Sequence, residues 1–192
     1  MATDKNKVEF GISSVHIGTY TVDAQTGNVT MGDPYHLPGA VSLSLDAESN
    51  DNKFYADNTI YWAGYTDNGF TGSLEVARFT DEFKKKFMGY IELDDGGLAQ
   101  IKNAVKPNLY IAFQSEGDAQ ARRGIIYNVS LGALSRSYET IEENQEPTTE
   151  TIDLTVVGDN KTGITRIGYS DDATGYATLF TNPPAPALPA ES

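Results

Sequence analysis

The sequence predicts a mainly β fold: a β-sandwich or barrel of about eight or nine strands with one short flanking helix near residues 80–88. Three observations predict it. Apolar and polar residues alternate along many short runs, turn-forming residues separate those runs, and one segment replaces the alternation with helical spacing. The 192 residues, 39% of them hydrophobic, fit one β domain with a sizeable core over residues 1–181.

Alternation is clearest in residues 41–46, where valine and leucine occupy the odd positions and serine and aspartate the even ones. Successive side chains of a strand point to opposite faces, so this pattern is typical of a half-buried strand. Similar runs predict strands at residues 8–12, 15–22, 59–65, 70–79, 109–114, 124–131, 152–157 and 164–169. Turn-forming residues separate them at 26–28, 38–39, 67–69, 94–97, 158–160 and 171–172.

One segment, between Thr80 and Gly89, predicts the helix. Thr80 offers a capping hydroxyl, acidic residues follow in the first turn, and Gly89 ends the segment. The lysine run 84–86 falls in the last turn, where it complements the helix dipole, and we expect it to form a solvated face. Phe83 and Phe87 are four residues apart, so we expect both side chains to pack against the sheet.

Three stretches show no strand pattern. Residues 46–57 are polar until Lys53, Phe54 and Tyr55, which predicts a long docking loop with aromatic residues at its end. Residues 137–151 are acidic and threonine-rich, typical of an extended linker. Residues 182–192 are rich in proline and alanine, so we expect a flexible C-terminal tail there.

Composition excludes several classes of function. The net charge is −13, from 27 acidic and 14 basic residues, which opposes tight binding to nucleic-acid phosphates. Cysteine is absent, so the sequence offers no disulfide framework, thiol nucleophile or thiolate metal site. The first residues lack a signal-peptide pattern, and no apolar run approaches membrane-spanning length. We therefore expect a protein made in the cytoplasm, soluble there and without a membrane partner.

No motif signals catalysis or a cofactor. The two histidines, His16 and His36, have no partner motif, and we interpret them as surface or edge-strand residues rather than an acid/base pair. The sequence contains no phosphate-binding glycine loop, zinc-binding HExxH or GxSxG nucleophile motif. We predict no catalytic residue, no cofactor and no enzymatic activity.

The strongest metal candidate is the spacing of Asp46, Glu48, Asn50 and Asp57, which is similar to a calcium loop. It departs from that loop where Asp51 replaces the glycine of the sharp turn and where the short Asp57 replaces a bidentate glutamate. We therefore interpret the segment as a solvated acidic stretch and predict no metal site.

Several segments, taken in order, share one pattern: residues 7–12 with Val15 and His16, 37–46, 54–58 (the most recognisable), 69–75 with 81–83, and 146–151. Together they resemble the major tail tube proteins of siphophages that infect Gram-positive bacteria, the phi13-type major tail protein family. The chain departs from the family at Thr80, where a proline is expected, and in its Pro/Ala tail.

The resemblance implies a structural virion protein of a long non-contractile tail, made in the host cytoplasm. Its copies would form hexameric rings, stacked into a tube through which viral DNA passes without specific binding. The implied partners are further copies of the chain and the tail tip or baseplate, tape measure and tail terminator proteins. The resemblance assigns contacts between subunits and rings to the segment 46–57 and to the two termini. The candidate residues in the segment are Asp46, Glu48, Asp51, Lys53, Phe54, Tyr55 and Asp57.

A second class of function stays open. Trp62 and the eleven tyrosines are compatible with a carbohydrate-binding or adhesion module of a phage or cell-surface assembly. Trp62 lies in a predicted strand, however, where aromatic residues are more often packed against the core or a neighbouring strand. A hydrolase that acts through His16 or His36 is a third alternative.

Overall fold

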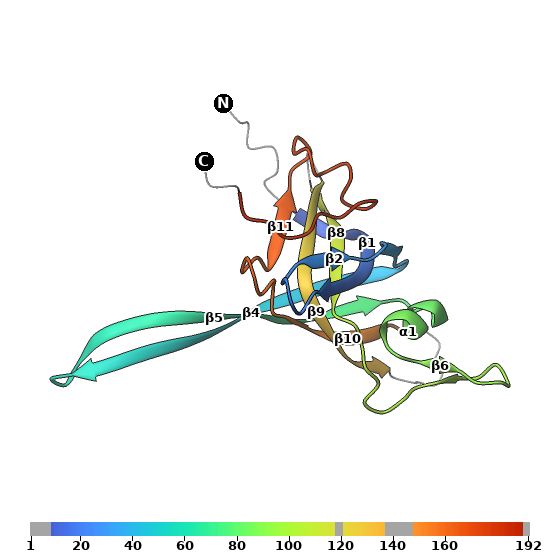
Figure 1. Cartoon of the computed structure of the whole chain (residues 1–192), viewed down its shortest axis with the longest axis horizontal. Helices are drawn as coiled ribbons and strands as arrows, with labels where there is room; N and C mark the ends of the chain where they lie inside the picture. Colours follow the sequence, from blue (N-terminus) through green and yellow to red (C-terminus); the bar gives the residue numbers. More distant parts are fainter. Residues whose placement is uncertain (1–8, 118–120, 137–147, 190–192) are drawn as a thin grey trace, which may run out of the picture.

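The structure is a computed structural model that describes residues 9–117, 121–136 and 148–189. This part of the chain contains eleven strands and one helix, which confirms the mainly β fold with one short helix (Figure 1). The elements are β1 (Glu9–Val22), β2 (Val29–Met31), β3 (Tyr35–His36), β4 (Ala40–Ala56), β5 (Thr59–Val76), α1 (Asp81–Phe87), β6 (Ile91–Glu92), β7 (Leu98–Ala99), β8 (Leu109–Gly117), β9 (Arg122–Arg136), β10 (Glu150–Val156) and β11 (Arg166–Tyr169).

Nine of these strands form one antiparallel sheet in the order β2-β1-β8-β9-β10-β5-β4, with β3 also paired to β1 and β11 to β9. The first part of β4 lies close to β1, although the two strands are far apart in the sheet order. The sheet therefore curls back on itself and encloses a core, instead of forming two separate sheets. β6 and β7 form a small separate hairpin.

Several predicted strands are parts of longer ones. The runs 8–12 and 15–22 merge into β1, and the runs 59–65 and 70–79 merge into β5. The predicted turn at 67–69 is wrong: β5 continues through it, with a register irregularity against β4. Gly69 has φ +94°, and a Cβ there would lie 2.1 Å from the carbonyl oxygen of Val156. The turn-forming residues at 67–69 mark a β-bulge instead of a turn, because a glycine with positive φ occurs in turns and in bulges.

The inner face of the curled sheet holds the larger core, and α1 covers it. Phe83 and Phe87 are fully buried, and the ring of Phe83 stacks on Phe79 with centroids 4.9 Å apart. The Thr80 hydroxyl accepts a hydrogen bond from the Phe83 N–H, so the predicted cap is present. Within the described ranges, no helix combines the length and the apolar character needed to cross a membrane.

The lysine run of α1 is only partly solvated, which corrects the sequence interpretation. Lys84 is buried, and its ammonium group lies 3.5 Å from the carboxylate of Glu150 on β10. That carboxylate also accepts a hydrogen bond from the Phe79 N–H. Lys85 remains exposed and pairs with Glu92. A buried charge needs such a partner, and this pair fixes α1 to the sheet.

The outer face of the sheet carries a second core, covered by the C-terminal segment, residues 170–189. Leu179 is fully buried there among tyrosines of β1, β8 and β9. The Tyr127 hydroxyl donates to the carbonyl of Pro184, so the described part of the expected tail lies against the domain. Its mobility in solution stays a prediction. Most of the predicted linker, residues 137–147, lies outside the described residues, and its last two residues begin β10.

A buried carboxylate fixes the loop between β10 and β11. Asp159 accepts hydrogen bonds from the Tyr20 hydroxyl and from both the N–H and the hydroxyl of Thr162. Burial alone would raise the pKa of Asp159, but these hydrogen bonds outweigh it and hold the pKa below its ordinary value of 3.8. Burial and the same bond to Asp159 raise the pKa of Tyr20.

We expect Asp159→Asn to lower the free energy of unfolding at pH 7 by about 1–3 kcal/mol, because buried donors lose a charged acceptor. Since the pKa of Asp159 is depressed in the folded state, its contribution is present above pH 3.8 and is lost as pH falls below it. Urea unfolding at pH 7 and pH 3 tests both points. The variant should differ less from the native chain at pH 3, and exposed Asp94→Asn is the control. An unchanged stability at pH 7 would contradict the expected role.

Candidate functional site

The most distinctive feature of the structure is a long β-hairpin that projects from the body (Figure 1). Its strands are the outer parts of β4 and β5, so the expectation of a loop at residues 46–57 is wrong. Asp57 and Asn58 form the two-residue turn, with φ +51° and +60°. Two positive φ values fit the hairpin turn that matches the twist of the flanking strands. Exposure on both faces explains why this segment lacks the alternation of a half-buried strand.

We call residues 48–68 the arm, because its two strands pair only with each other. The next strand, β10, pairs with β5 as far as Phe70 and ends there. A two-stranded hairpin is marginally stable in water without a third strand or a supporting helix. The arm therefore has two open edges and no support from its own domain.

Large apolar side chains gather on the arm and are exposed. Tyr65 is 81% exposed, Tyr61 77% and Trp62 55%. Trp62 therefore lies outside the core, which leaves the other expected position, beside a neighbouring strand. Exposed apolar clusters of this size mark interaction sites in soluble proteins. The complete set is Phe54, Tyr55, Ile60, Tyr61, Trp62 and Tyr65.

Both faces of the arm carry these side chains. Phe54 lies directly opposite Trp62, and Tyr55 lies opposite Ile60, on the other face. Tyr61 is the extra residue at a register irregularity, and its ring meets that of Phe54 edge-on at 6.5 Å. The Trp62 ring lies over Gly64, where a Cβ would be only 2.6 Å from the indole. Glycine at this position keeps the indole flat along the strand.

The contact residues predicted from the sequence all lie on β4 or in the turn: Asp46, Glu48, Asp51, Lys53, Phe54, Tyr55 and Asp57. Some of the charged ones have partners within the chain. Glu48 accepts a hydrogen bond from Thr71, and Lys53 forms a salt bridge with Asp51. Their role as contacts between subunits stays a prediction. The predicted contact set included no residue of the β5 strand, although Trp62 and Tyr65 on it are exposed.

The calcium-loop spacing is not realised as a loop. Asp46, Glu48 and Asn50 lie on the extended β4, where alternate side chains form a row along one face. A calcium loop winds around the ion so that its oxygens converge. In residues 9–117, 121–136 and 148–189, no three histidine or acidic side chains are grouped as they would be around a metal ion.

The fold brings the two histidines together, which the sequence did not indicate. His16 and His36 are cross-strand partners on β1 and β3, with ring centroids 5.0 Å apart. The His16 ring also stacks on Phe180 of the C-terminal segment at 4.6 Å. Burial lowers the pKa of His16; the hydrogen bond with the Ser14 carbonyl opposes this shift, and the nearby His36 and Arg123 add to it. The ring serves here as a packing surface for the C-terminal segment.

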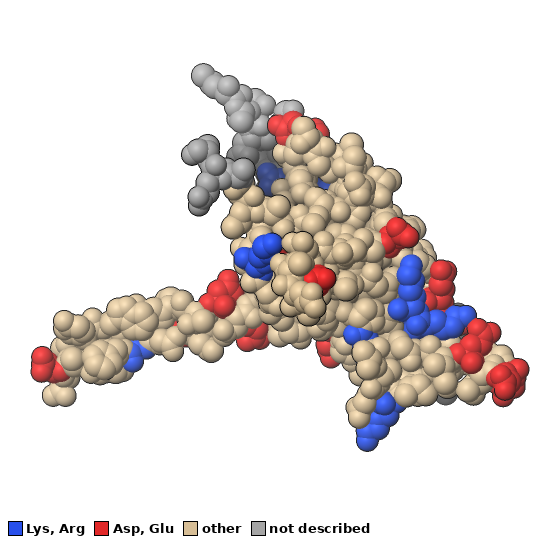
Figure 2. Space-filling model, viewed as in Figure 1, with Lys and Arg blue, Asp and Glu red and all other residues tan. Residues whose placement is uncertain are grey.

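Exposed aromatic side chains and a few charges share the surface of the arm. Figure 2 shows the visible side of the arm as mostly uncharged, with a few acidic and basic side chains, whereas both signs gather on the body around α1 and the β6–β7 hairpin. The arm is thus an aromatic projection with a small excess of acidic residues, suited to contact with another protein surface.

No protein-family model matches the chain, and no curated protein matches it. Among solved structures, the chain is similar to a chain in the sheath-tube complex of PVC, an extracellular contractile injection system, in its extended state. The two chains are 13% identical, with a TM-score of 0.45, over 82% of this chain and 88% of the other. We derive no function from a likeness at this level.

Proposed function

We propose that this chain is a structural virion protein, the major tail tube subunit of a long non-contractile phage tail. In this proposal six copies form a ring, rings stack into a tube, and DNA passes through the channel. The arm, with its six exposed apolar side chains, is the observation that carries the proposal. The sequence resemblance to siphophage tail tube proteins supports the kind of assembly.

Another copy of the chain is the simplest partner for the arm. Each arm strand has one unpaired edge, and such edges pair readily with strands of other chains. Identical subunits that bind head-to-tail close into a ring when the rotation allows it, or extend as a stack when it does not. One arm on every subunit therefore supplies the same contact at every position of a tube.

The charge of the chain also supports a DNA channel. A net charge of −13 repels phosphate, so DNA would pass an acidic surface without adhering to it. In the proposal the tail tip or baseplate, the tape measure protein and the tail terminator are further partners, and the chain is made in the host cytoplasm.

Electron microscopy of the purified chain tests this function. We expect hollow tubes of stacked six-membered rings, either from the chain alone at high concentration or after addition of a tail-tip complex as a seed. Particles without a central channel, or monomers under both conditions, would contradict the proposal.

A second candidate is a carbohydrate-binding or adhesion module, which the exposure of Trp62 favours because sugars stack on exposed aromatic rings. A pull-down of the chain with host cell walls tests it. Binding that is lost in Trp62→Ala, with unchanged thermal unfolding, would favour this candidate. Assembly into tubes without wall binding would favour the tube subunit.

A further inference from the structure

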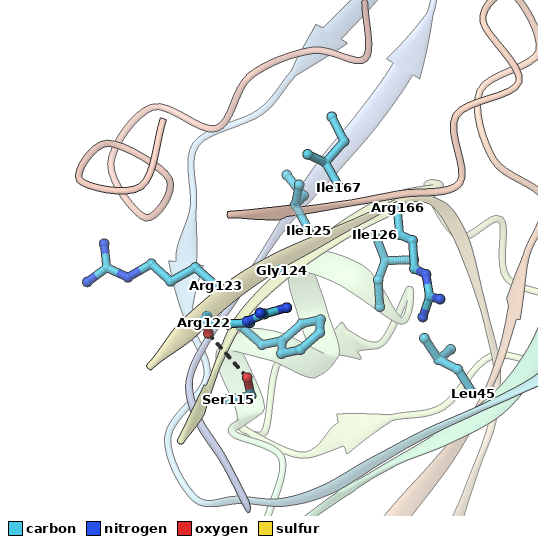
Figure 3. A pocket seen from close by; sticks show the side chains of 11 residues that line it. Leu45, Ser115, Arg122, Arg123, Gly124, Ile125, Ile126, Arg166 and Ile167 are labelled. Atoms are coloured by element: carbon cyan, nitrogen blue, oxygen red, sulfur yellow. Dashed lines mark hydrogen bonds between the residues drawn. The ribbon is translucent and has the colours of Figure 1, made fainter. Parts of the chain in front are cut away.

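A groove lies beside the inner core, on the body near the base of the arm, and three arginines are among the residues that line it. Its volume is about 430 Å³, within the range of pockets that enclose a ligand. Arg122 of β9 and Arg166 of β11 reach into it, together with Leu45 of β4 (Figure 3). Phe113 and Ile126 add apolar surface.

The groove is basic on a strongly acidic protein. None of the residues that line it is aspartate or glutamate. Arg166 lies opposite Ile126 in the sheet, and its guanidinium lies 5.5 Å from the centre of the Phe70 ring. The neighbouring Arg123 points away, as Figure 3 shows, and stacks on Tyr176 and Phe180. Planar guanidinium groups over an apolar floor suit both aromatic rings and carboxylates.

The arm has the complementary chemistry. Among residues 48–68 it carries four acidic residues, Glu48, Asp51, Asp57 and Asp67, and one lysine, Lys53. Its apolar side chains are mostly aromatic. An acidic aromatic projection and a basic apolar groove thus occur on the same chain.

We propose that the groove receives the tip of the arm from a second copy of the chain. This inference rests on the proposed function, since it names the surface that accepts the arm during assembly. In the complex, Arg122 and Arg166 would lie against the aromatic rings of the tip and the carboxylate of Asp57, and Leu45, Phe113 and Ile126 would form the floor beneath them.

The length of the arm makes the contact intermolecular. Leu45 lines the groove, and Asp57 at the tip follows twelve residues later along an extended strand. At about 3.3 Å per residue, the tip projects roughly 40 Å from the groove of its own chain. Every subunit then offers one tip and one groove to other copies, which is a heterologous contact that can continue from copy to copy.

Cross-linking between copies tests the location of the contact. The native chain has no cysteine, so single cysteines can be introduced without background reaction. We expect Asp57→Cys and Arg166→Cys variants, mixed and treated with a short bis-maleimide, to yield a cross-linked dimer. Asp57→Cys mixed with Ile101→Cys, which lies on a separate exposed apolar surface, is the matched control. Equal or preferential cross-linking to position 101 would overturn the proposal.

Charge reversal in the groove tests its contribution. We expect Arg166→Glu to raise the concentration required for assembly at least about tenfold, because Asp57 at the tip would face a carboxylate and the aromatic rings would lose a cation. Exposed Arg78→Glu is the matched control and should assemble like the native chain. Thermal unfolding checks that both variants fold, and Arg122→Glu replaces Arg166→Glu if the latter does not.

The outcomes separate this inference from the proposed function. Native chains and Arg166→Glu chains that assemble equally well would overturn the groove as the acceptor and leave the tube subunit intact. Native chains that fail to assemble even with a seed would overturn both.

Discussion

The double variant Phe54→Ala and Trp62→Ala is expected to lose assembly and to keep its fold. The two side chains lie opposite each other on one face of the arm, far from both cores. Burying a large apolar side chain contributes about 1.5–3 kcal/mol, so losing two weakens each contact by about 3–6 kcal/mol. A loss of 3 kcal/mol corresponds to roughly a hundredfold higher concentration for assembly. Sedimentation across a concentration series measures it.

The control for this variant is Thr66→Ala, a smaller exposed change on the same arm. It should assemble at a concentration close to that of the native chain. Thermal unfolding of the double variant should match the native chain, because the arm adds little to the core. Tubes that form at the native concentration without Phe54 and Trp62 would show that the aromatic arm does not hold copies together.

Phe83→Ala is expected to cost about 3–5 kcal/mol in free energy of unfolding. The ring is fully buried and touches three other rings, those of Phe79, Phe87 and Tyr35. Removal leaves a cavity beneath α1 that the curled sheet cannot close. For a domain stable by about 5–15 kcal/mol, that is a large fraction of the total.

Urea unfolding followed by circular dichroism measures this loss. Phe54→Ala is the matched control, since it removes the same ring from an exposed position and should change stability by less than about 0.5 kcal/mol. A loss of less than about 0.5 kcal/mol for Phe83→Ala, equal to that of the control, would contradict the role of this ring in the core.

Local signals predicted the helix well, because its determinants are close together in the sequence. The cap at Thr80 and the spacing of Phe83 and Phe87 each act within one or two turns. The burial of Lys84 could not be predicted in this way. Its partner, Glu150, is 66 residues further along the chain and approaches only when β10 joins the sheet.

The arm shows the opposite case. Burial on one face normally produces the alternation that reveals a strand, and the arm has no buried face. The resemblance nevertheless indicated residues 46–57 as a contact segment, and most of these residues form one strand of the arm. Residues 59–65 were predicted as a strand, but their pairing with the segment 46–57 was not. Interpreting Asp57 and Asn58 as a hairpin turn would have placed Trp62 opposite Phe54.

The groove could not have been predicted from the sequence. Arg122 and Arg166 are 44 positions apart and have no shared motif. They meet because β11 pairs with β9, and β4 brings Leu45 to the same place. Only the order of strands in the sheet makes these three residues neighbours.

Fluorescence of the single tryptophan tests the central claim most directly, because Trp62 lies on the arm and is exposed in the isolated chain. Emission and acrylamide quenching can be followed as the concentration rises and, in parallel, the particles are sized by sedimentation. We expect the emission to shift to shorter wavelength and quenching to fall at the concentration where assembly begins. Particles that assemble while Trp62 remains fully quenchable would contradict a role for the arm in joining the copies.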